Sequence, residues 1–316
     1  YLDFLSMYPT VNALMGLWRH VTAGRIEVED ATDEIRALVE RVQAADCVDP
    51  ALWPELPALV QIKPGGDVLP IRARYGNGRS WGIGSNPLHS DEPLWYALPD
   101  VIASKLITGQ ASEIIRALRL VPADEQRGLS PVKLRSEVQI DPRKHDLFKA
   151  AIERRRQLSD KNGPTGRFLK TFANGTSYGI YAEMTRRELP AGQRQEVTVH
   201  GLTEQPFTAS VGAPEHPGRY AFPPMAACIT AAARLMLAIL ETLVTERGGT
   251  WAFADTDSMA VVATEHGGLV PCPGGPERGS EGRECARALS WPQIDEVVQR
   301  FEALNPYDRA RAGLGA

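Results

Sequence analysis

The chain has 316 residues, of which 43% are hydrophobic and 23% are charged, proportions typical of a globular protein with a sizeable core. This composition excludes a disordered chain, a collagen-like repeat and a small disulfide-bonded domain. The 35 Lys and Arg residues against 39 Asp and Glu residues give a formal charge of −4. Taken alone, this charge argues against a basic nucleic-acid-binding protein.

The N-terminal third predicts short strands and helices. A strand at 1–4 opens the chain with no lead-in, so we expect a fragment cut inside a domain. The predicted elements that follow are a helix at 10–18, an amphipathic helix at 31–46 with Ile35, Leu38, Val39 and Val42 on one face, strands at 59–62 and 68–74 around a turn at 64–67, and a helix at 95–108.

The middle of the chain predicts a helical hairpin, with helices at 147–158 and 166–176 around the turn-forming segment 160–164. Strands at 180–184 and 196–200 follow, and then a long helix at 223–246 that begins with proline. Its most apolar part, 225–240, contains Arg234 and is shorter than the ~20 residues that span a bilayer. We therefore expect a buried helix and no membrane partner.

The C-terminal part predicts a β-hairpin with strands at 251–254 and 259–263 and a tight turn at 255–257. A loop rich in glycine and proline is predicted at 266–283. Ser290 is expected to cap a last helix whose inward side chains are Ile294, Val297, Val298, Phe301 and Leu304.

The four cysteines, Cys47, Cys228, Cys272 and Cys285, form no C-x-x-C pair and have no spacing typical of a zinc site. Cys228 lies in an apolar run, where a cysteine serves as a small buried hydrophobic residue. The pattern favours a reducing compartment, and we expect a cytoplasmic protein.

Charge is unevenly distributed along the chain. Residues 132–175 hold 11 Lys and Arg against 5 Asp and Glu, a local charge of +6 that leaves −10 for the remainder. The positive block coincides with the predicted helical hairpin. The overall charge of −4 therefore does not exclude DNA as a ligand.

Asp255 and Asp257 are the sharpest chemical feature, because they flank one residue at a turn between apolar strands. Two like charges about 4 Å apart repel by ~4 kcal/mol at an effective dielectric of 20, so either a basic side chain or a divalent cation must offset them. Oxygen ligands favour Mg²⁺ or Mn²⁺. If the strand of Asp3 lies beside this hairpin, three carboxylates converge and can hold two metal ions ~3.5–4 Å apart, as in phosphoryl transfer. The alternatives are a solvated acidic turn and a strand-end acid facing water.

Phosphoryl transfer also needs cations on the phosphates, and the predicted hairpin supplies them. They are Arg154, Arg155, Arg156, Lys161, Arg167 and Lys170. We choose Arg155 and Lys170 as phosphate ligands, although Arg154 or Arg156 can take the place of Arg155. The alternative is a solvated basic helix face.

Three segments stand out as a set: DFLSMYPT at 3–10, KTFANGTSYG at 170–179 and FADTDS at 253–258. Together they resemble the motifs D-F-x-S-L-Y-P-S, K-x-x-x-N-S-x-Y-G and Y-G-D-T-D-S of family B DNA polymerases. They occur in the family order with family-like gaps. The resemblance runs from residue 1 to about residue 263 and extends towards 305–307.

The resemblance implies a role for each motif residue. Asp3 and Asp257 would be the main metal ligands, supported by Asp255 and by the carbonyl of Phe4. The backbone at Ser6, Met7 and Tyr8 would cradle the triphosphate, with the Tyr8 ring as the steric gate against a 2′-hydroxyl. The remaining implied contacts are phosphates with Arg155 and Lys170, the nucleotide with Asn174, and the minor-groove side of the nascent base pair with Tyr178 and Gly179.

The chain departs from the family pattern at several points. The second motif has one extra residue between Asn174 and Tyr178, with Gly175 in the place of serine, so its register is uncertain by one residue. The third has Phe-Ala for Tyr-Gly. The family's exonuclease domain and thumb have no counterpart here, so we expect the 316-residue piece to be inactive by itself.

The resemblance implies an α+β fold: a polymerase palm, mostly an antiparallel sheet backed by helices, with an inserted helical fingers hairpin. The palm would comprise 1–140 and 179–316, the latter with the metal-binding hairpin and the start of the connection to the thumb, and the fingers 141–178. The expected reaction joins a dNTP to a primer 3′-hydroxyl on template DNA, with two Mg²⁺ ions or Mn²⁺ in their place. Accessory replication factors are not indicated.

Two other functions remain open. A glycosyltransferase can use an Asp-x-Asp pair to hold a metal-bound nucleotide-sugar, but it needs an open α/β nucleotide domain before that pair and has no use for the basic hairpin. A decayed DNA-binding remnant would have lost catalytic acids, whereas all three acids are present here.

Overall fold

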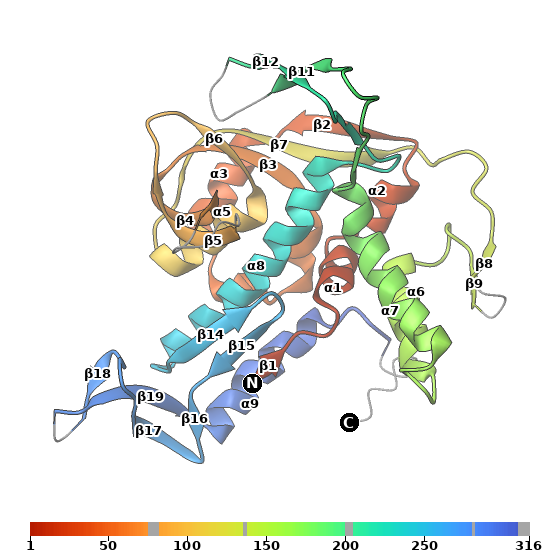
Figure 1. The fold of residues 1–316 in the computed structure, drawn as a ribbon. Helices are drawn as coiled ribbons and strands as arrows, with labels where there is room; N and C mark the ends of the chain where they lie inside the picture. The colour runs from red at the N-terminus through yellow and green to blue at the C-terminus, as the bar shows by residue number, and fades with distance from the viewer. Residues whose placement is uncertain (75–81, 135–137, 200–204, 280–281, 309–316) are drawn as a thin grey trace.

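The computed structural model describes residues 1–74, 82–134, 138–199, 205–279 and 282–308. Its helices lie between several small sheets (Figure 1), so the expected α+β class is confirmed at that level. The helices are α1 (Met7–Leu14), α2 (Trp18–Thr22), α3 (Thr32–Arg41), α4 (Ala44–Cys47), η1 (Pro50–Glu55), α5 (Leu98–Thr108), α6 (Leu147–Gln157), α7 (Pro164–Ser177), η2 (Gly179–Tyr181), α8 (Pro223–Glu246), α9 (Trp291–Phe301) and η3 (Glu302–Leu304).

The strands pair almost throughout in antiparallel fashion; among the described residues β16–β19 is the parallel exception. One three-stranded sheet has the order β1 (Leu2–Asp3), β15 (Ser258–Val261), β14 (Trp251–Asp255). A four-stranded sheet has the order β2 (Arg25–Asp30), β7 (Glu113–Ala123), β3 (Ala58–Lys63), β6 (Leu94–Ala97). Another contains β16 (Ala263–Thr264), β19 (Glu284–Ser290), β17 (His266–Pro271) and β18 (Glu277–Arg278). The two-stranded pairs are β4 (Gly65–Ala73) with β5 (Gly82–His89), β8 (Val132–Leu134) with β9 (Val138–Ile140), β10 (Met184–Arg186) with β13 (Glu215–Pro217), and β11 (Gln195–Val199) with β12 (Phe207–Val211).

Helix α8 is the centre of the core, and its bounds match the predicted helix. It is the one described helix long and apolar enough to cross a membrane by length and composition, yet 67% of its most apolar stretch is buried inside the protein. Its Arg234 forms two hydrogen bonds with the buried carboxylate of Asp100 in α5, at 2.7 and 2.9 Å. An internal ion pair between packed helices is typical of a core helix, as expected from the sequence, and Cys228 is fully buried there.

The sheet β1-β15-β14 lies against α8 and carries the acidic residues. Leu2 pairs with Met259 and Asp3 with Ser258, so the first strand lies beside the hairpin, as predicted. Met259 is buried in the main core. Side chains alternate between the two faces of a strand. Asp3 and Asp255 both pair with Ser258 and therefore lie on the face opposite Leu2 and Met259, while Asp257 lies in the turn.

Helices α6 and α7 form the predicted hairpin, which stands beside α1 (Figure 1). The tight turn between them needs glycine at position 166, because a Cβ atom there would lie 2.2 Å from the carbonyl oxygen of Lys161. Asp146 caps α6 by accepting hydrogen bonds from the N–H groups of Phe148 and Lys149.

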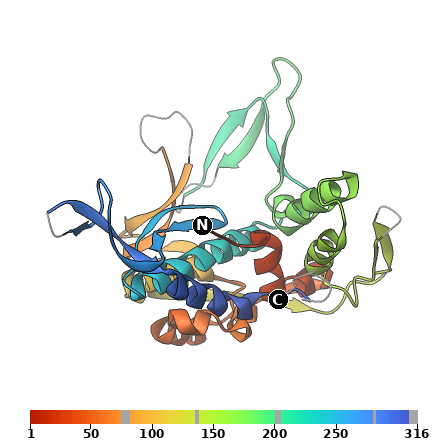
Figure 2. The same ribbon diagram turned by 90° about the horizontal axis from the view of Figure 1, so that it is seen from below.

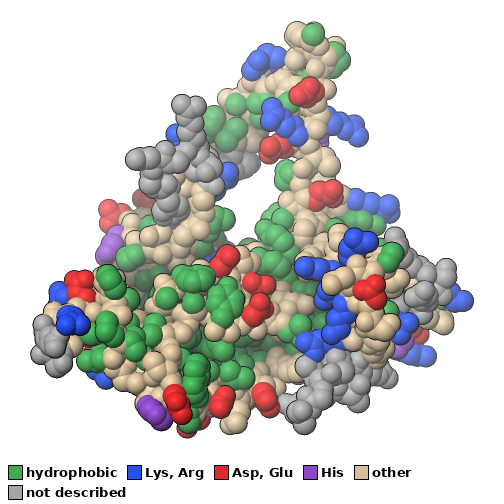
Figure 3. Space-filling model, turned by 60° about the horizontal axis from the view of Figure 1, so that its bottom comes forward, with side chains coloured by type: hydrophobic (Ala, Val, Ile, Leu, Met, Phe, Trp, Pro, Cys, Tyr) green, Lys and Arg blue, Asp and Glu red, His purple; other side chains and the backbone are tan. Residues whose placement is uncertain are grey.

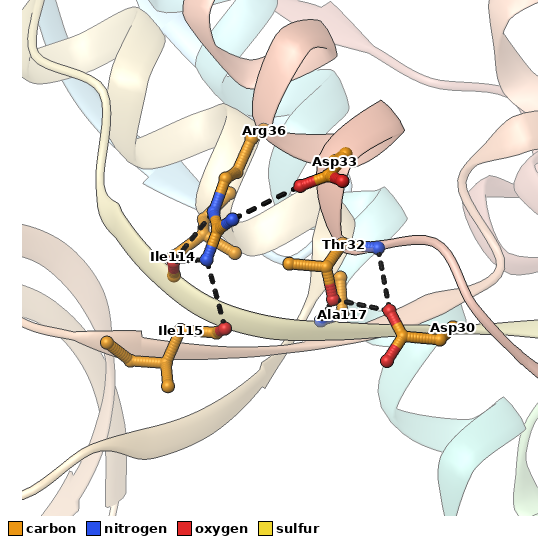
Figure 4. A network of polar contacts seen from close by, with 7 residues as sticks. All are labelled: Asp30, Thr32, Asp33, Arg36, Ile114, Ile115 and Ala117. Carbon is orange, nitrogen blue, oxygen red and sulfur yellow. Dashed lines mark hydrogen bonds and ion pairs between the residues drawn. The ribbon is translucent and has the colours of Figure 1, made fainter.

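Helix α3 is fixed to the four-stranded sheet by a polar network (Figure 4). The register between β3 and β7 shifts next to Ile62, and there the guanidinium of Arg36 donates to the carbonyls of Ile114 and Ile115. Thr32 accepts from the N–H of Ala117 and donates to Asp30. The network satisfies carbonyls at the irregular point of the ladder, where pairing would otherwise be lost.

The strands β10 to β13 form an arm that projects from the body between α7 and α8, as Figure 2 shows for β11 and β12. Most of its side chains are exposed. A strand was predicted at 180–184, but residues 179–181 form the helical turn η2 and the strand begins at Met184.

Several other predicted bounds were wrong. The helix at 10–18 begins at Met7 and breaks around Gly16, which has φ +64°, and the helix at 31–46 is divided into α3 and α4. Residues 95–97 of the predicted helix 95–108 belong to the strand β6. The predicted loop 266–283 contains β17 and β18. The last helix has the expected Ser290 cap, but Val298 is 42% exposed rather than inward. Position 200 of the strand predicted at 196–200 lies outside the described residues.

Candidate active site

Asp3 and Asp257 lie close together because a backbone hydrogen bond joins the two chain segments that carry them. Asp3 ends β1, and Asp257 lies in the turn between β14 and β15. The N–H of Phe4 donates to the carbonyl of Asp257 at 2.8 Å. The register that pairs Asp3 with Ser258 therefore places residues 3 and 257 next to each other at one end of the sheet.

The backbone is strained at two points beside these acids. Ser6 has φ +47° and Thr256 has φ +42°, in the left-handed region that favours glycine. The N–H of Asp257 donates to the carbonyl of Asp255 at 2.5 Å, which closes the turn around Thr256. Such residues cost about 1–3 kcal/mol each and are concentrated at functional sites. The strain marks this end of the sheet as a candidate active site.

A cavity of about 330 Å³ lies in front of the acids. Nine of its lining residues were selected from the sequence, namely Asp3, Phe4, Ser6, Met7, Tyr8, Arg155, Lys170, Asn174 and Asp257. Leu5, Ile152 and Thr256 also line it and were not selected. The cavity thus joins the acidic sheet, the start of α1 and the inner side of the helical hairpin, which are separated by up to about 250 positions in the sequence.

One wall of this cavity carries acidic side chains and the facing wall carries basic ones. Burial and, next, the negative charge of Asp3 raise the pKa of the Asp257 carboxyl. Arg155 and Lys170 enter the same cavity from α6 and α7. Figure 3 shows acidic side chains near the middle of this face and a group of Lys and Arg side chains beside them over the hairpin. Repulsion between the acids makes a bound cation favourable, and the cations on the facing wall favour an anion.

The three neighbouring arginines of α6 have different surroundings. Arg155 lines the cavity, and its Nε donates to the carbonyl of Gly166 at 3.3 Å. Arg156 lines a separate cavity of about 240 Å³ on the other side of Asp3. Arg154 bonds to Gln157 of its own helix. Of the three candidates, Arg155 is therefore the one placed to meet a ligand in front of Asp257.

Tyr8 and Tyr178 form a stacked pair, with ring centroids 5.1 Å apart and an interplanar angle of 20°. Burial first and the neighbouring Tyr178 phenol next raise the pKa of Tyr8. Tyr178 lies directly after α7 and does not line the cavity, and Gly179 begins η2. The pair therefore joins the start of α1 to the end of the hairpin at one wall of the cavity.

Asp255 does not join the other two acids in the cavity wall, and its side chain is exposed. Within the described ranges, no group of three Asp, Glu, His or Cys side chains is arranged to hold one metal ion. What is present is a pair of carboxylates, Asp3 and Asp257, together with the Phe4 backbone. Carboxylate oxygens of this kind suit Mg²⁺ or Mn²⁺.

Comparison with known proteins found no match among family models, curated proteins or solved structures.

Proposed function

We propose that the chain is the catalytic part of a template-directed DNA polymerase, which transfers a nucleotide from a dNTP to a primer 3′-hydroxyl. The observation that carries the proposal is the shared cavity. The three segments that together resemble polymerase motifs, 3–10, 170–179 and 253–258, all line it, and Arg155 of α6 lines it beside them. Their convergence in one cavity is the arrangement that nucleotidyl transfer requires.

The triphosphate lies between α1 and the hairpin. The first N–H groups of a helix lack partners within that helix and favour an anion, and α1 begins at Met7 in the cavity wall. Arg155 and Lys170 approach from the opposite wall and form charge-assisted hydrogen bonds with the phosphates. Asn174, one turn after Lys170, contacts the nucleotide itself.

Asp3, Asp257 and the carbonyl of Phe4 would hold Mg²⁺ or Mn²⁺ ions, whereas Asp255 lies outside the cavity wall. When bound, two such ions lower the pKa of an attacking hydroxyl and neutralise charge that develops on the phosphates. The chain's own contribution is to hold the α-phosphorus opposite the primer oxygen. The new P–O bond forms there, the bond to pyrophosphate breaks, and the hydroxyl proton is lost.

The Tyr8 ring bounds the sugar position. It lies in the cavity wall and is held on its other side by Tyr178. A 2′-hydroxyl would need the space that the Tyr8 ring fills. The minor-groove side of the nascent base pair would face Tyr178 and Gly179, and the primer–template would bind mainly through its phosphates.

The strand pairings give little support to the glycosyltransferase alternative. That function needs an open parallel sheet with a nucleotide at its carboxyl edge, whereas among the described residues only β16 and β19 are parallel. The decayed-remnant alternative predicts that the site has lost its acids, but Asp3 and Asp257 line the cavity together.

We expect Arg155→Ala to weaken binding of a Mg²⁺–dNTP complex to the chain by about tenfold or more, because a hydrogen bond to a charged group contributes about 1.5–3 kcal/mol. Arg154→Ala is the matched control, since the same residue type on the same helix bonds to Gln157 outside the cavity. Equilibrium titration with a fluorescent dNTP measures both. Equal losses in the two variants, or no nucleotide binding by the unaltered chain, would contradict the proposed site.

A further inference from the structure

Asn12 is a fully buried polar residue in the apolar part of α1. Its side-chain Nδ2 donates two hydrogen bonds, one to the carbonyl of Tyr8 at 2.7 Å and one to the carbonyl of Ser177 at 2.8 Å. Because both partners are acceptors, the amide nitrogen must face them. Asn12 therefore links a residue of the cavity wall to a residue 165 positions away in the hairpin.

The bond to Ser177 reaches the end of α7. The last carbonyls of a helix have no partner within that helix, and Ser177 is the final residue of α7 and fully buried. Its hydroxyl donates to the carbonyl of Asn174, which lines the cavity. Asn12 thus supplies from α1 a donor that caps α7, the helix on which Lys170 and Asn174 are placed.

The stacked tyrosine rings form a second contact between α1 and the end of α7. Tyr8 lies one turn before Asn12 in α1, and Tyr178 comes directly after Ser177. The rings of Tyr8 and Tyr178 stack at 5.1 Å. The backbone of Tyr178, with φ −150° and ψ −56°, has left the helix. The amide of Asn12 fixes the two backbones that carry the rings.

The amide oxygen at the other end of the Asn12 side chain indicates that the side chain acts through its N–H donors rather than through packing. Oδ1 is buried and has no hydrogen-bond partner among the described residues. An unpaired buried acceptor is costly, and an apolar side chain of similar size would avoid that cost. Asparagine is therefore a poor choice for packing and is useful here for its two N–H donors.

We propose that Asn12 is a positioning residue for nucleotide binding, which holds the end of α7 against α1 and so keeps Tyr178 stacked on Tyr8 in the cavity wall. It does not line the cavity and acts through the tyrosine pair and the carbonyl of Ser177. The structural half of the inference stands by itself, and the half that concerns nucleotide affinity rests on the proposed function.

The test uses the 316-residue chain labelled with 3-fluorotyrosine, whose ¹⁹F resonances report on ring stacking. Tyr8→Phe and Tyr178→Phe assign the two signals, and Tyr178→Ala gives the unstacked position of Tyr8. We expect Asn12→Leu to move the Tyr8 resonance at least half of the way to that position and to raise the dissociation constant for Mg²⁺–dNTP about fivefold to tenfold, since two hydrogen bonds are lost. Asn12→Met, also without a donor and a good helix former, should do the same.

Thr176→Val is the matched control. Thr176 precedes Ser177, and its hydroxyl donates within α7 to the carbonyl of Phe172, so its loss leaves the link to α1 intact. Both measurements should stay at their unaltered values in this variant. An unchanged Tyr8 resonance in Asn12→Leu and Asn12→Met, or an equal shift in Thr176→Val, would overturn the inference. The expected resonance shift in a chain that binds no dNTP would support the structural link and contradict the proposed function.

Discussion

Replacement of Asp257 by asparagine is expected to reduce primer extension by about 10³-fold or more, which corresponds to about 4 kcal/mol of transition-state stabilisation. Asp257 and Asp3 are the two carboxylates that meet in the cavity. Asparagine keeps the shape of the side chain but removes half of the negative charge that would hold the catalytic cations. The measurement is single-turnover extension of a primer–template by the protein as its gene encodes it.

DNA binding and stability are the controls for this variant. Burial and the charge of Asp3 raise the pKa of Asp257, so the folded state binds this proton more tightly than the unfolded chain. Stability therefore falls as the pH rises from the unfolded to the folded pKa, and at neutral pH the ionised carboxylate opposes folding. We expect Asp257→Asn to be at least as stable as the unaltered chain and to bind DNA normally.

Asp255→Asn is the matched comparison, because Asp255 lies in the same turn but outside the cavity wall. Its loss of activity should be clearly smaller. If Asp257→Asn retained extension, or if both variants lost it equally, the assignment of Asp257 as the principal acid of the turn would be wrong.

Removal of the Tyr8 ring is expected to admit ribonucleotides. In the proposed complex the ring would fill the space of a 2′-hydroxyl, and forcing extra atoms into a packed site costs about 1–3 kcal/mol. In Tyr8→Ala the preference for dNTP over NTP, measured as the ratio of kcat/KM values, should fall about tenfold to a hundredfold. Steady-state incorporation of a single nucleotide gives both constants.

Tyr8→Phe separates the ring from its hydroxyl. Phenylalanine keeps the stack on Tyr178 and the volume of the wall, so discrimination should remain close to that of the unaltered protein. Unchanged discrimination in Tyr8→Ala would remove Tyr8 as the gate. An equal loss in Tyr8→Phe would show that the hydroxyl, and not the ring, excludes the ribose.

Local patterns were sufficient to predict most of the elements that carry the site, although α1 begins three residues before its predicted start. The apolar run with proline at its start marked α8, and the turn residues at 160–164 marked the α6–α7 hairpin. The acidic turn was recognised because its flanking strands are apolar. The strand of Asp3 was expected beside that turn, and the pairing of Asp3 with Ser258 confirms this expectation.

Long-range pairing and the alternative preferences of short segments were not predictable in this way. Strand β2 was missed although Ile26 and Val28 alternate with charged residues; it is almost entirely exposed, and its partner β7 lies about 90 positions later. The apolar pattern of residues 94–97 is compatible with a helix and with a strand, and these residues form a strand because they pair with β3. Asn12 was missed, although a polar residue among apolar neighbours in α1 was a usable signal.

Template-dependent incorporation tests the central claim most directly. The protein, as its gene encodes it, is given Mg²⁺, a primer–template and one dNTP at a time, opposite each of the four template bases. We predict addition of the nucleotide complementary to the template base, and its loss in Asp257→Asn. Addition without regard to the template, or no addition in the presence of Mg²⁺ or Mn²⁺, would contradict a template-directed polymerase.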